Sequence, residues 1–179
     1  MLMDARELLH RYFWNFWLEI IYFTKLIKKK FKTNDKSVRF HKDHENLLQM
    51  IYQVISAYFQ DDCADELTLD PVFHAVLDKE SLASQPTLSR FFNRMDEDTL
   101  VQFDDIDKNL RDIIYSIKRP EHMLLDLDST LFGTYGKQEG EGFNFHYQAH
   151  GYHPLLCCDG LTGDLLKAEL RDGTLHCSN

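Results

Sequence analysis

The sequence has few of the residues that interrupt or cross-link a chain, and it lacks the marks of a secreted protein. Only four of its 179 residues are proline and eight are glycine. The four cysteines, Cys63, Cys157, Cys158 and Cys177, form no CxxC pair, and no small-residue cleavage site follows the early apolar run. These absences argue against a disulfide-rich secreted domain and a signal peptide. We therefore expect reduced thiols in a cytoplasmic protein.

The longest apolar stretch, from Tyr12 to Ile27, does not have the composition of a membrane span. Arg11, Asn15 and Glu19 recur at every fourth residue, which places them on one stripe of a helix. A spanning helix needs about 20 largely uncharged residues, and a glutamate near its middle is costly. The stretch is therefore predicted to be an amphipathic helix that packs against protein, with no membrane involved.

Charge is distributed unevenly along the chain. The net charge is −9, yet residues 1–60 carry 10 Lys and Arg against 6 Asp and Glu, which gives +4, and the rest carry 10 against 23. The basic residues cluster at Lys25, Lys28, Lys29, Lys30, Lys32, Lys36, Arg39 and Lys42. Such a cluster is typical of a phosphate-contacting surface and equally of a solvated linker between helices. Charge alone leaves both open.

Residues 1–118 show helical periodicity. The predicted apolar stripe of one helix is Leu47, Ile51, Val54, Ile55 and Tyr58. Asp43 is its expected N-cap, and Asp61-Asp62 its expected end. Asp70-Pro71 is expected to open the next helix, and a third begins near Pro86. A fourth helix carries apolar residues expected in the core: Leu100, Phe103, Ile106, Leu110, Ile113, Ile114 and Ile117.

From Arg119-Pro120 onward the pattern changes from helix to strand. Met123 to Asp128 is a short apolar run that ends in alternating acids, and Phe145–Cys158 and Leu165–Leu170 are two more expected strands. Asp159 to Gly163 joins the last two as a hairpin turn that contains glycine. The sequence therefore predicts an α+β fold, with helical residues 1–118 and a strand-forming region in 119–179.

Asp126 and Asp128 are the first candidates for chemistry. They alternate with leucines, so a strand would project both carboxylates from one face. Carboxylates at a strand end beside Ser129 and Thr130 suit a hard divalent cation such as Mg²⁺. Phosphoryl transfer with two metals needs several carboxylates from different elements, and one strand supplies only part of that set. The alternative is that the two aspartates cap a strand end before a turn.

Several blocks of the sequence resemble the DDE transposases of bacterial insertion sequences, in particular transposase DDE domain group one. They are LLDLDST, GKQEG, FNFHYQAHGYHPLL and DGLTGDLLKAELRDG, and upstream LLQMIYQVISAYFQDDCADEL, LDPVF and LASQPTLSRFFNR. The resemblance covers about residues 40–179, with the blocks in the family's order. Residues 1–39 match poorly.

The resemblance implies the first three antiparallel strands of a ribonuclease-H-like core, incomplete in this chain. Asp128 matches the family's first metal-binding aspartate, and Asp126 lies beside it. The second aspartate and the glutamate have no counterpart here. Asp159 and Asp164 are expected to have structural roles in the hairpin turn. The cofactor implied for the complete enzyme is Mg²⁺ or Mn²⁺.

Residues Leu82 to Arg90 look like the second helix of a helix-turn-helix motif. Ser84 would be the N-cap. The candidate DNA-binding residues are Lys28, Lys29, Lys30, Gln85, Thr87, Arg90 and Arg94, and the alternative is a capped helix in a bundle with solvated arginines. A zinc site among His146, His150, His153, Cys157 and Cys158 is not expected, since on one strand His153 would point away from the other two histidines.

Two hypotheses of function follow. In the first, the chain is the N-terminal part of a transposase that cuts and joins DNA at its element's terminal inverted repeats. With one of three acids present, the truncated chain is expected to be inactive. In the second, it is a non-catalytic DNA-binding fragment or regulator. Both imply double-stranded DNA as partner in a bacterial cytoplasm, associated with the nucleoid, and both leave a homodimer open.

Overall fold

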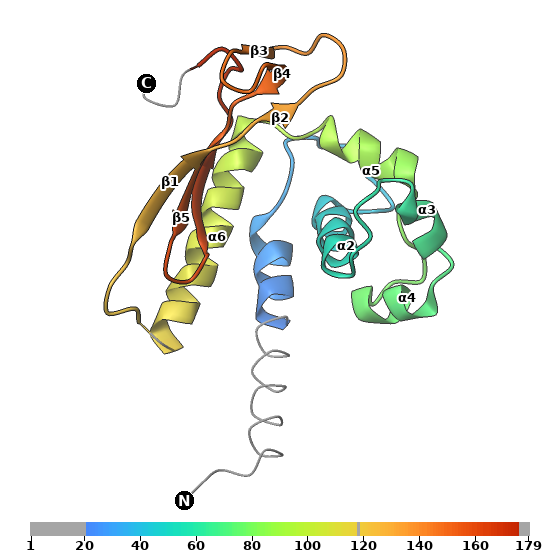
Figure 1. The fold of residues 1–179 in the computed structure, drawn as a ribbon. Coiled ribbons are helices and arrows are strands. Elements are labelled where there is room, and N and C mark those ends of the chain that lie inside the picture. The colour runs from blue at the N-terminus through green and yellow to red at the C-terminus, as the bar shows by residue number, and fades with distance from the viewer. Residues whose placement is uncertain (1–20, 118, 176–179) are drawn as a thin grey trace, which may run out of the picture. The chain divides into compact units, whose positions relative to one another are not determined.

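The structure, a computed structural model, describes residues 21–117 and 119–175 (Figure 1). The chain divides into two compact units, Met1–Ile114 and Tyr115–Asn179. We describe each unit by itself. The assignment of residues 1–118 to DNA binding and of 119–179 to a catalytic domain stays a prediction.

Helices make up the described part of the first unit. Residues 21–30 are helical, and the helices that follow are α2 (Asp43–Ile55), α3 (Cys63–Leu67), α4 (Pro71–Leu77), α5 (Gln85–Phe92) and α6 (Glu97–Ile117), the last of which runs into the second unit. The helical character predicted for this region is therefore confirmed over the described residues. Within those residues, no helix is long and apolar enough to cross a membrane.

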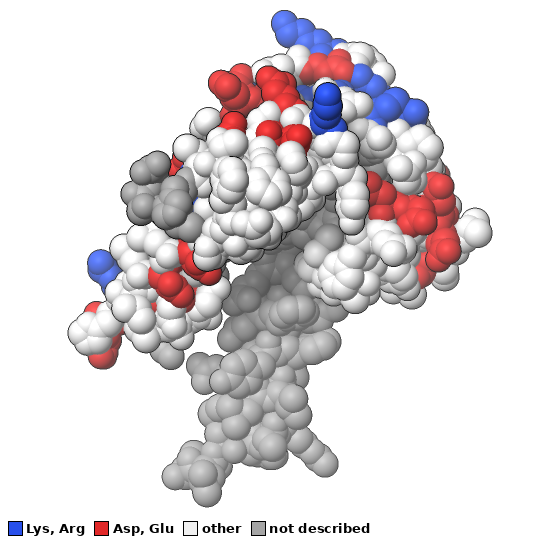
Figure 2. Space-filling model, turned by 45° about the horizontal axis from the view of Figure 1, so that its top comes forward, with Lys and Arg blue, Asp and Glu red and all other residues white. Residues whose placement is uncertain are grey.

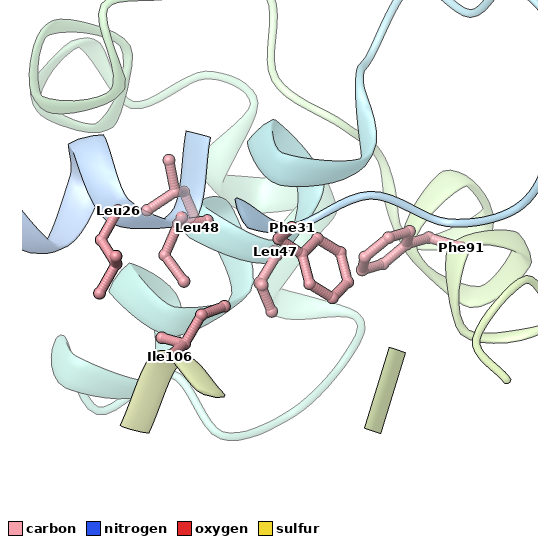
Figure 3. Close-up of a cluster of buried hydrophobic side chains, with 7 residues drawn as sticks. Leu26, Phe31, Leu47, Leu48, Phe91 and Ile106 are labelled. Carbon is pink, nitrogen blue, oxygen red and sulfur yellow. The ribbon is translucent and has the colours of Figure 1, made fainter. Parts of the chain in front are cut away.

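The core of this unit forms around the C-terminal end of the helix at residues 21–30. Phe31 is central, because its ring lies 5.9 Å from the ring of Phe91 in α5 and 5.2 Å from that of Phe103 in α6. The buried members of the cluster are Leu26, Ile27, Phe31, Leu47, Leu48, Phe91 and Ile106 (Figure 3). Leu26 and Ile27 thus pack against protein as predicted, whereas Arg11, Asn15 and Glu19 lie outside the described residues.

Two of the predicted helix boundaries hold and two are wrong. Asp70 caps α4, its side chain accepting a hydrogen bond from the Val72 N–H at 2.7 Å, and Ser84 is the N-cap residue of α5. However, the N-cap of α2 is Lys42. The Asp43 carboxylate instead accepts hydrogen bonds from Thr33 and Arg94. That helix also ends at Ile55, well before Asp61-Asp62, since the chain reverses through Ala57 at a φ of 66°.

The apolar stripes predicted for α2 and α6 are only partly buried. Leu47 and Ile106 lie in the core. Val54 and Ile55 in α2, and Leu100, Ile114 and Ile117 in α6, are exposed. Helical periodicity identified these faces correctly near the centre of the unit and overestimated how far along each helix the core extends.

A buried side-chain amide connects α2 to the loop that leads into α5. Gln49, only 2% exposed, accepts from the Ala83 N–H at 2.8 Å and donates to the Ala83 C=O at 2.7 Å. Ala83 immediately precedes Ser84. The contact therefore fixes where α5 begins relative to α2, and α5 packs against α2 and α3.

The second unit contains two small antiparallel sheets. The first has the order β1-β5-β6, from β1 (Leu125–Ser129), β5 (Leu155–Asp159) and β6 (Leu165–Glu169). The second has the order β2-β4-β3, from β2 (Phe132–Gly133), β3 (Gly142–Asn144) and β4 (Ala149–Tyr152). The mixed α+β class is confirmed, and the predicted three-strand meander corresponds to the first sheet.

The expected single strand from Phe145 to Cys158 is wrong. Residues 145–148 form a turn that ends at Gln148 with a φ of 53°, and β4 and β5 are separate strands in different sheets. Pro154 lies at the break, where it has no N–H to offer a ladder. The hairpin predicted at Asp159–Gly163 is present, with Gly163 at a φ of 79°.

Replacing Gln49 with leucine should destabilise the first unit. The Ala83 N–H and C=O would both lose their partners in a buried position, and each such group costs about 1–3 kcal/mol. We expect the free energy of unfolding, from urea titration of the full chain, to fall by about 2–4 kcal/mol.

Gln102→Leu is the matched control, because Gln102 makes the same two contacts, with the N–H and C=O of Lys32, at an exposed position. Water can replace that side chain, so the expected loss is at most about 0.5 kcal/mol. Equal losses in the two variants would contradict the role given to burial.

Candidate functional site

Asp126 and Asp128 lie on one face of β1, and both are exposed. Their partners in the register of β5 are Cys158 and Leu156, which therefore lie on the same face. The N–H of Ser129 donates to Asp128 Oδ1 at 2.8 Å. The strand thus presents two solvent-accessible carboxylates side by side, one of them already oriented by the backbone.

These carboxylates have the right chemistry for a divalent cation but are too few to enclose one. Mg²⁺ prefers about six oxygen ligands in near-octahedral geometry, often one or two of them carboxylates. Among residues 21–117 and 119–175, no group of three or more His, Cys, Asp or Glu side chains could hold a metal ion. Asp126 and Asp128 therefore fit one edge of a metal site, and the described residues do not complete it.

The end of β1 is held by contacts that the sequence did not indicate. Tyr147, in the turn at 145–148, donates its hydroxyl to the carbonyl of Ser129 at 2.9 Å, and the N–H of Thr130 donates to the Pro154 carbonyl at 3.3 Å. Ser129 is buried although Asp128 is exposed. Tyr147 was read only as part of a strand, and no local pattern points to its partner.

Asp159 fastens the start of β1. Its Oδ1 accepts from the N–H of Leu124 at 3.2 Å and from the N–H of Leu161 at 3.0 Å, and the side chain is only 1% exposed. Asp164 accepts from the Thr162 hydroxyl in the same turn at 2.8 Å. Both aspartates thus make contacts within the hairpin, and neither lies on an exposed strand face with Asp126 and Asp128.

The three histidines considered for zinc have different surroundings. His146 lies in the turn and not on a strand, which corrects the strand geometry assumed for it. His150 pairs with Glu141 at 3.1 Å on an exposed surface. His153 is buried, with Nδ1 at 2.7 Å from the Leu175 carbonyl.

The basic segment is exposed, but not all of its cations are available. Lys30 pairs with Asp105, and Arg39 with Asp35. Lys28 and Lys29 are exposed, and no carboxylate of the described residues lies within ion-pair distance of either. Figure 2 shows Lys and Arg near the top of the view, beside a group of Asp and Glu. A phosphate-contacting surface would therefore be short.

Helix α5 presents its candidate residues unequally. Arg90 is exposed, and Thr87 is half-buried beside it. The N–H of Gln85 donates to the Asp65 carboxylate of α3 at 2.8 Å. Because helix N-termini attract anions, a DNA phosphate approaching this end would compete with Asp65.

Arg94 is engaged in a largely buried ion pair. Its Nη2 donates to Asp43 Oδ1 at 2.9 Å, its side chain is only 10% exposed, and its guanidinium lies over the Phe91 ring. Burial alone would raise the pKa of Asp43, but hydrogen bonds from Thr33 and Arg94 lower it below the usual value. Arg94 thus joins α5 to α2 in this structure.

Comparison with known protein families finds a match over most of the chain. The family model of transposase DDE domain group 1 matches residues 18–179, all but the first 17 residues of the chain. No curated protein and no solved structure is similar enough to match. The family match begins earlier than the resemblance seen in the sequence blocks, which covered about residues 40–179.

Asp159 and Asp128 should differ in how much each contributes to the stability of the protein, and this difference can be measured. Asp159→Ala removes an acceptor from two backbone N–H groups, and hydrogen bonds to charged groups contribute about 1.5–3 kcal/mol. We expect a loss of about 2–3 kcal/mol from the unfolding free energy of the full chain, with faster amide hydrogen exchange in β5 and β6.

Asp128→Ala serves as the comparison, because it removes one acceptor, from the Ser129 N–H, at an exposed carboxylate, and should lower stability by no more than about 1 kcal/mol. A large loss of unfolding free energy in Asp128→Ala, or no loss in Asp159→Ala, would contradict the structural role given to Asp159 and the exposed position given to Asp128.

Proposed function

Because the chain belongs to the transposase DDE domain group 1 family, which implies a role in DNA transposition, we propose that Asp128 is the first metal-binding carboxylate of its catalytic site. Asp126 is the second carboxylate on the same face. The observation that carries the proposal is the exposed pair of carboxylates on β1. The resemblance of LLDLDST to the family implies that Asp128 is the first aspartate. The reaction is cleavage and strand transfer of DNA at insertion-sequence ends.

The proposed core is ribonuclease-H-like, and the antiparallel order β1-β5-β6 supports it. Such a core would place Asp128 on its first strand. DDE transposases generally use a divalent metal, and the proposed ion is Mg²⁺ or Mn²⁺, which would supply positive charge beside the attacking and leaving oxygens of a phosphodiester. Asp126 and Asp128 would hold one side of that ion. The remaining ligands must come from groups other than these two.

The 179-residue chain by itself is proposed to be inactive. Two-metal phosphoryl transfer needs carboxylates that converge from several elements. In the described residues β1 offers two exposed carboxylates on one face of this sheet, whereas Asp159 and Asp164 hold the hairpin. The exposed Glu169 of β6 pairs in register with Leu155 and so lies on the opposite face from Asp128. The chain therefore supplies part of the acid set.

A strand-transfer assay tests this proposal. The purified chain is incubated with Mg²⁺ or Mn²⁺ and duplex DNA that carries the element's terminal repeats. We expect no cleaved or joined product above the level of Asp128→Ala, because removing the first acid from an incomplete set changes nothing further.

If product forms with the native chain and not with Asp128→Ala, the chain is active, and the proposed role of Asp128 is supported. Equal amounts of product above background with both proteins would contradict the proposed inactivity and also the catalytic role of Asp128.

We further propose that the basic segment binds double-stranded DNA through its phosphates, whether or not the chain is catalytic. The exposed Lys28 and Lys29 support this, with Lys30 beside them, and on α5 the exposed Arg90 with Thr87 and Gln85. For Arg94 we propose a structural role in place of DNA contact, given its ion pair with Asp43. The homodimer stays a prediction.

Replacing Lys28, Lys29 and Lys30 with alanine should weaken binding to duplex DNA in a salt-dependent way. Each phosphate contact contributes about −0.9 to the slope of log K against log salt concentration. Because Lys30 pairs with Asp105, Lys28 and Lys29 are the expected phosphate contacts, and the slope should become less negative by about 2, as measured by fluorescence anisotropy from 50 to 200 mM salt.

The control with the same charge change is Lys108→Ala, Arg119→Ala and Lys137→Ala, which lie outside the basic segment. An equal loss of affinity and slope in this control would show attraction by overall charge and not by the segment.

A further inference from the structure

The turn at residues 145–148 is joined to the end of β1 by one side chain. Tyr147 donates its hydroxyl to the Ser129 carbonyl at 2.9 Å, across 18 residues of sequence. The acceptor belongs to a buried residue, and the tyrosine is about one-third exposed. A hydrogen bond partly shielded from water persists better than an exposed one, because water competes less for the carbonyl.

Ser129 is engaged at both of its backbone groups. Its C=O accepts from Tyr147, and its N–H donates to Asp128 Oδ1 at 2.8 Å. The first contact restrains the peptide that follows Ser129, and the second restrains the carboxylate of Asp128. The orientation of the Asp128 side chain therefore depends on a residue that Tyr147 holds in place.

The strand needs such a restraint because of its position in the sheet. In the order β1-β5-β6, β1 is an edge strand that, within residues 21–117 and 119–175, pairs with β5 alone. Its register with β5 ends at the pair Ser129 and Leu155. Edge-strand ends have fewer contacts than central strands and open more readily. Tyr147 closes the end at which Asp128 lies.

Tyr147 is itself held rigidly enough to act as this restraint. Its N–H donates to Asn144 Oδ1 at 3.3 Å, and the Asn144 amide donates to the Gly173 carbonyl at 3.1 Å. The tyrosine ring meets the ring of buried His153 edge to face, with centroids 5.7 Å apart. The ring is thus held against His153, in the segment between β4 and β5, while the turn is anchored through Asn144 to the segment that follows β6.

We infer that Tyr147 is a positioning residue for Asp128, acting through Ser129. The inference rests on the proposed function, in which Asp128 binds a divalent cation. A carboxylate held in one rotamer loses less freedom when it binds the ion than a carboxylate that samples several. Removing a single hydrogen bond of ordinary strength should weaken cation binding by a factor of about 3 to 10.

The test is a Mn²⁺ titration of the ¹⁵N-labelled full chain, followed by paramagnetic broadening of the amide signals of β1. Four proteins are compared: the native chain, Tyr147→Phe, Asp128→Asn, and Tyr135→Phe, whose native side chain is 97% exposed. We expect broadening centred on β1 in the native chain, its loss in Asp128→Asn, and a dissociation constant about 3- to 10-fold higher in Tyr147→Phe alone.

Thermal melts of the same proteins separate positioning from folding. A merely structural tyrosine would lower the melting temperature of Tyr147→Phe without changing the dissociation constant of the folded protein. An unchanged constant in folded Tyr147→Phe overturns the inference and leaves the metal role of Asp128 intact. If the native chain shows no broadening that depends on Asp128, the proposed metal site fails, and this inference fails with it.

A second measurement keeps the inference testable if Tyr147→Phe does not fold. In the native chain without metal, the three-bond couplings across the Cα–Cβ bond of Asp128 report its rotamers. Couplings of a single rotamer are expected, because Ser129 holds the carboxylate. Averaged couplings would show that Asp128 is not positioned and would overturn the inference.

Discussion

The antiparallel pairing of β1 with β5 is the constraint on which the proposed site depends. It sets the face on which Asp126 and Asp128 lie, and among the described residues no strand pairs with the other edge of β1. Such a strand is held only on one side, and the structure fastens it at both ends. Asp159 binds the Leu124 N–H before the strand, and Tyr147 binds the Ser129 carbonyl at its last residue. Asp159 and Tyr147 both follow β1 in the sequence. The strand therefore reaches its final position only when the segments that carry these two residues have folded.

The first unit uses the same kind of contact to place its helices. Gln49 fixes the loop before α5, and the Asp43–Arg94 ion pair fixes its end, so that α2 holds α5 at two points. Removing one partner of a buried ion pair leaves an unpaired charge, which costs far more than the pair contributes. This is why an arginine that looks available for DNA in the sequence is better understood as part of the helix packing. The surface left for phosphates is correspondingly smaller, and Asp65 occupies the N-terminal end of α5.

Local signals predicted much of this structure, and long-range contacts account for what they missed. The Asp70-Pro71 helix start, the strand before Ser129 and the turn at Asp159–Gly163 each depend on a few neighbouring residues, and all three were predicted. Asp43 was assigned as an N-cap because its true partners, Thr33 and Arg94, are 10 and 51 residues away. The break at Pro154 was missed because the apolar pattern continues across it. The pair Asp126 and Asp128 could be found from alternation alone, whereas Tyr147 could not, since nothing near it in the sequence identifies Ser129 as its partner.

The charge distribution explains why the two proposed roles need different conditions. The second unit, residues 115–179, carries 9 Asp and Glu against 5 Lys and Arg, so a phosphodiester that approaches β1 would meet repulsion from the unit as well as from Asp126 and Asp128. Bound divalent cations would reverse the local sign, because they are the largest charges in such a site. The basic segment would act without divalent cations, but its proposed attraction for DNA would extend only about 8–10 Å at physiological salt. The proposed attraction of DNA to the chain and its proposed approach to Asp128 would therefore be separable steps, the first sensitive to monovalent salt and the second to divalent cations.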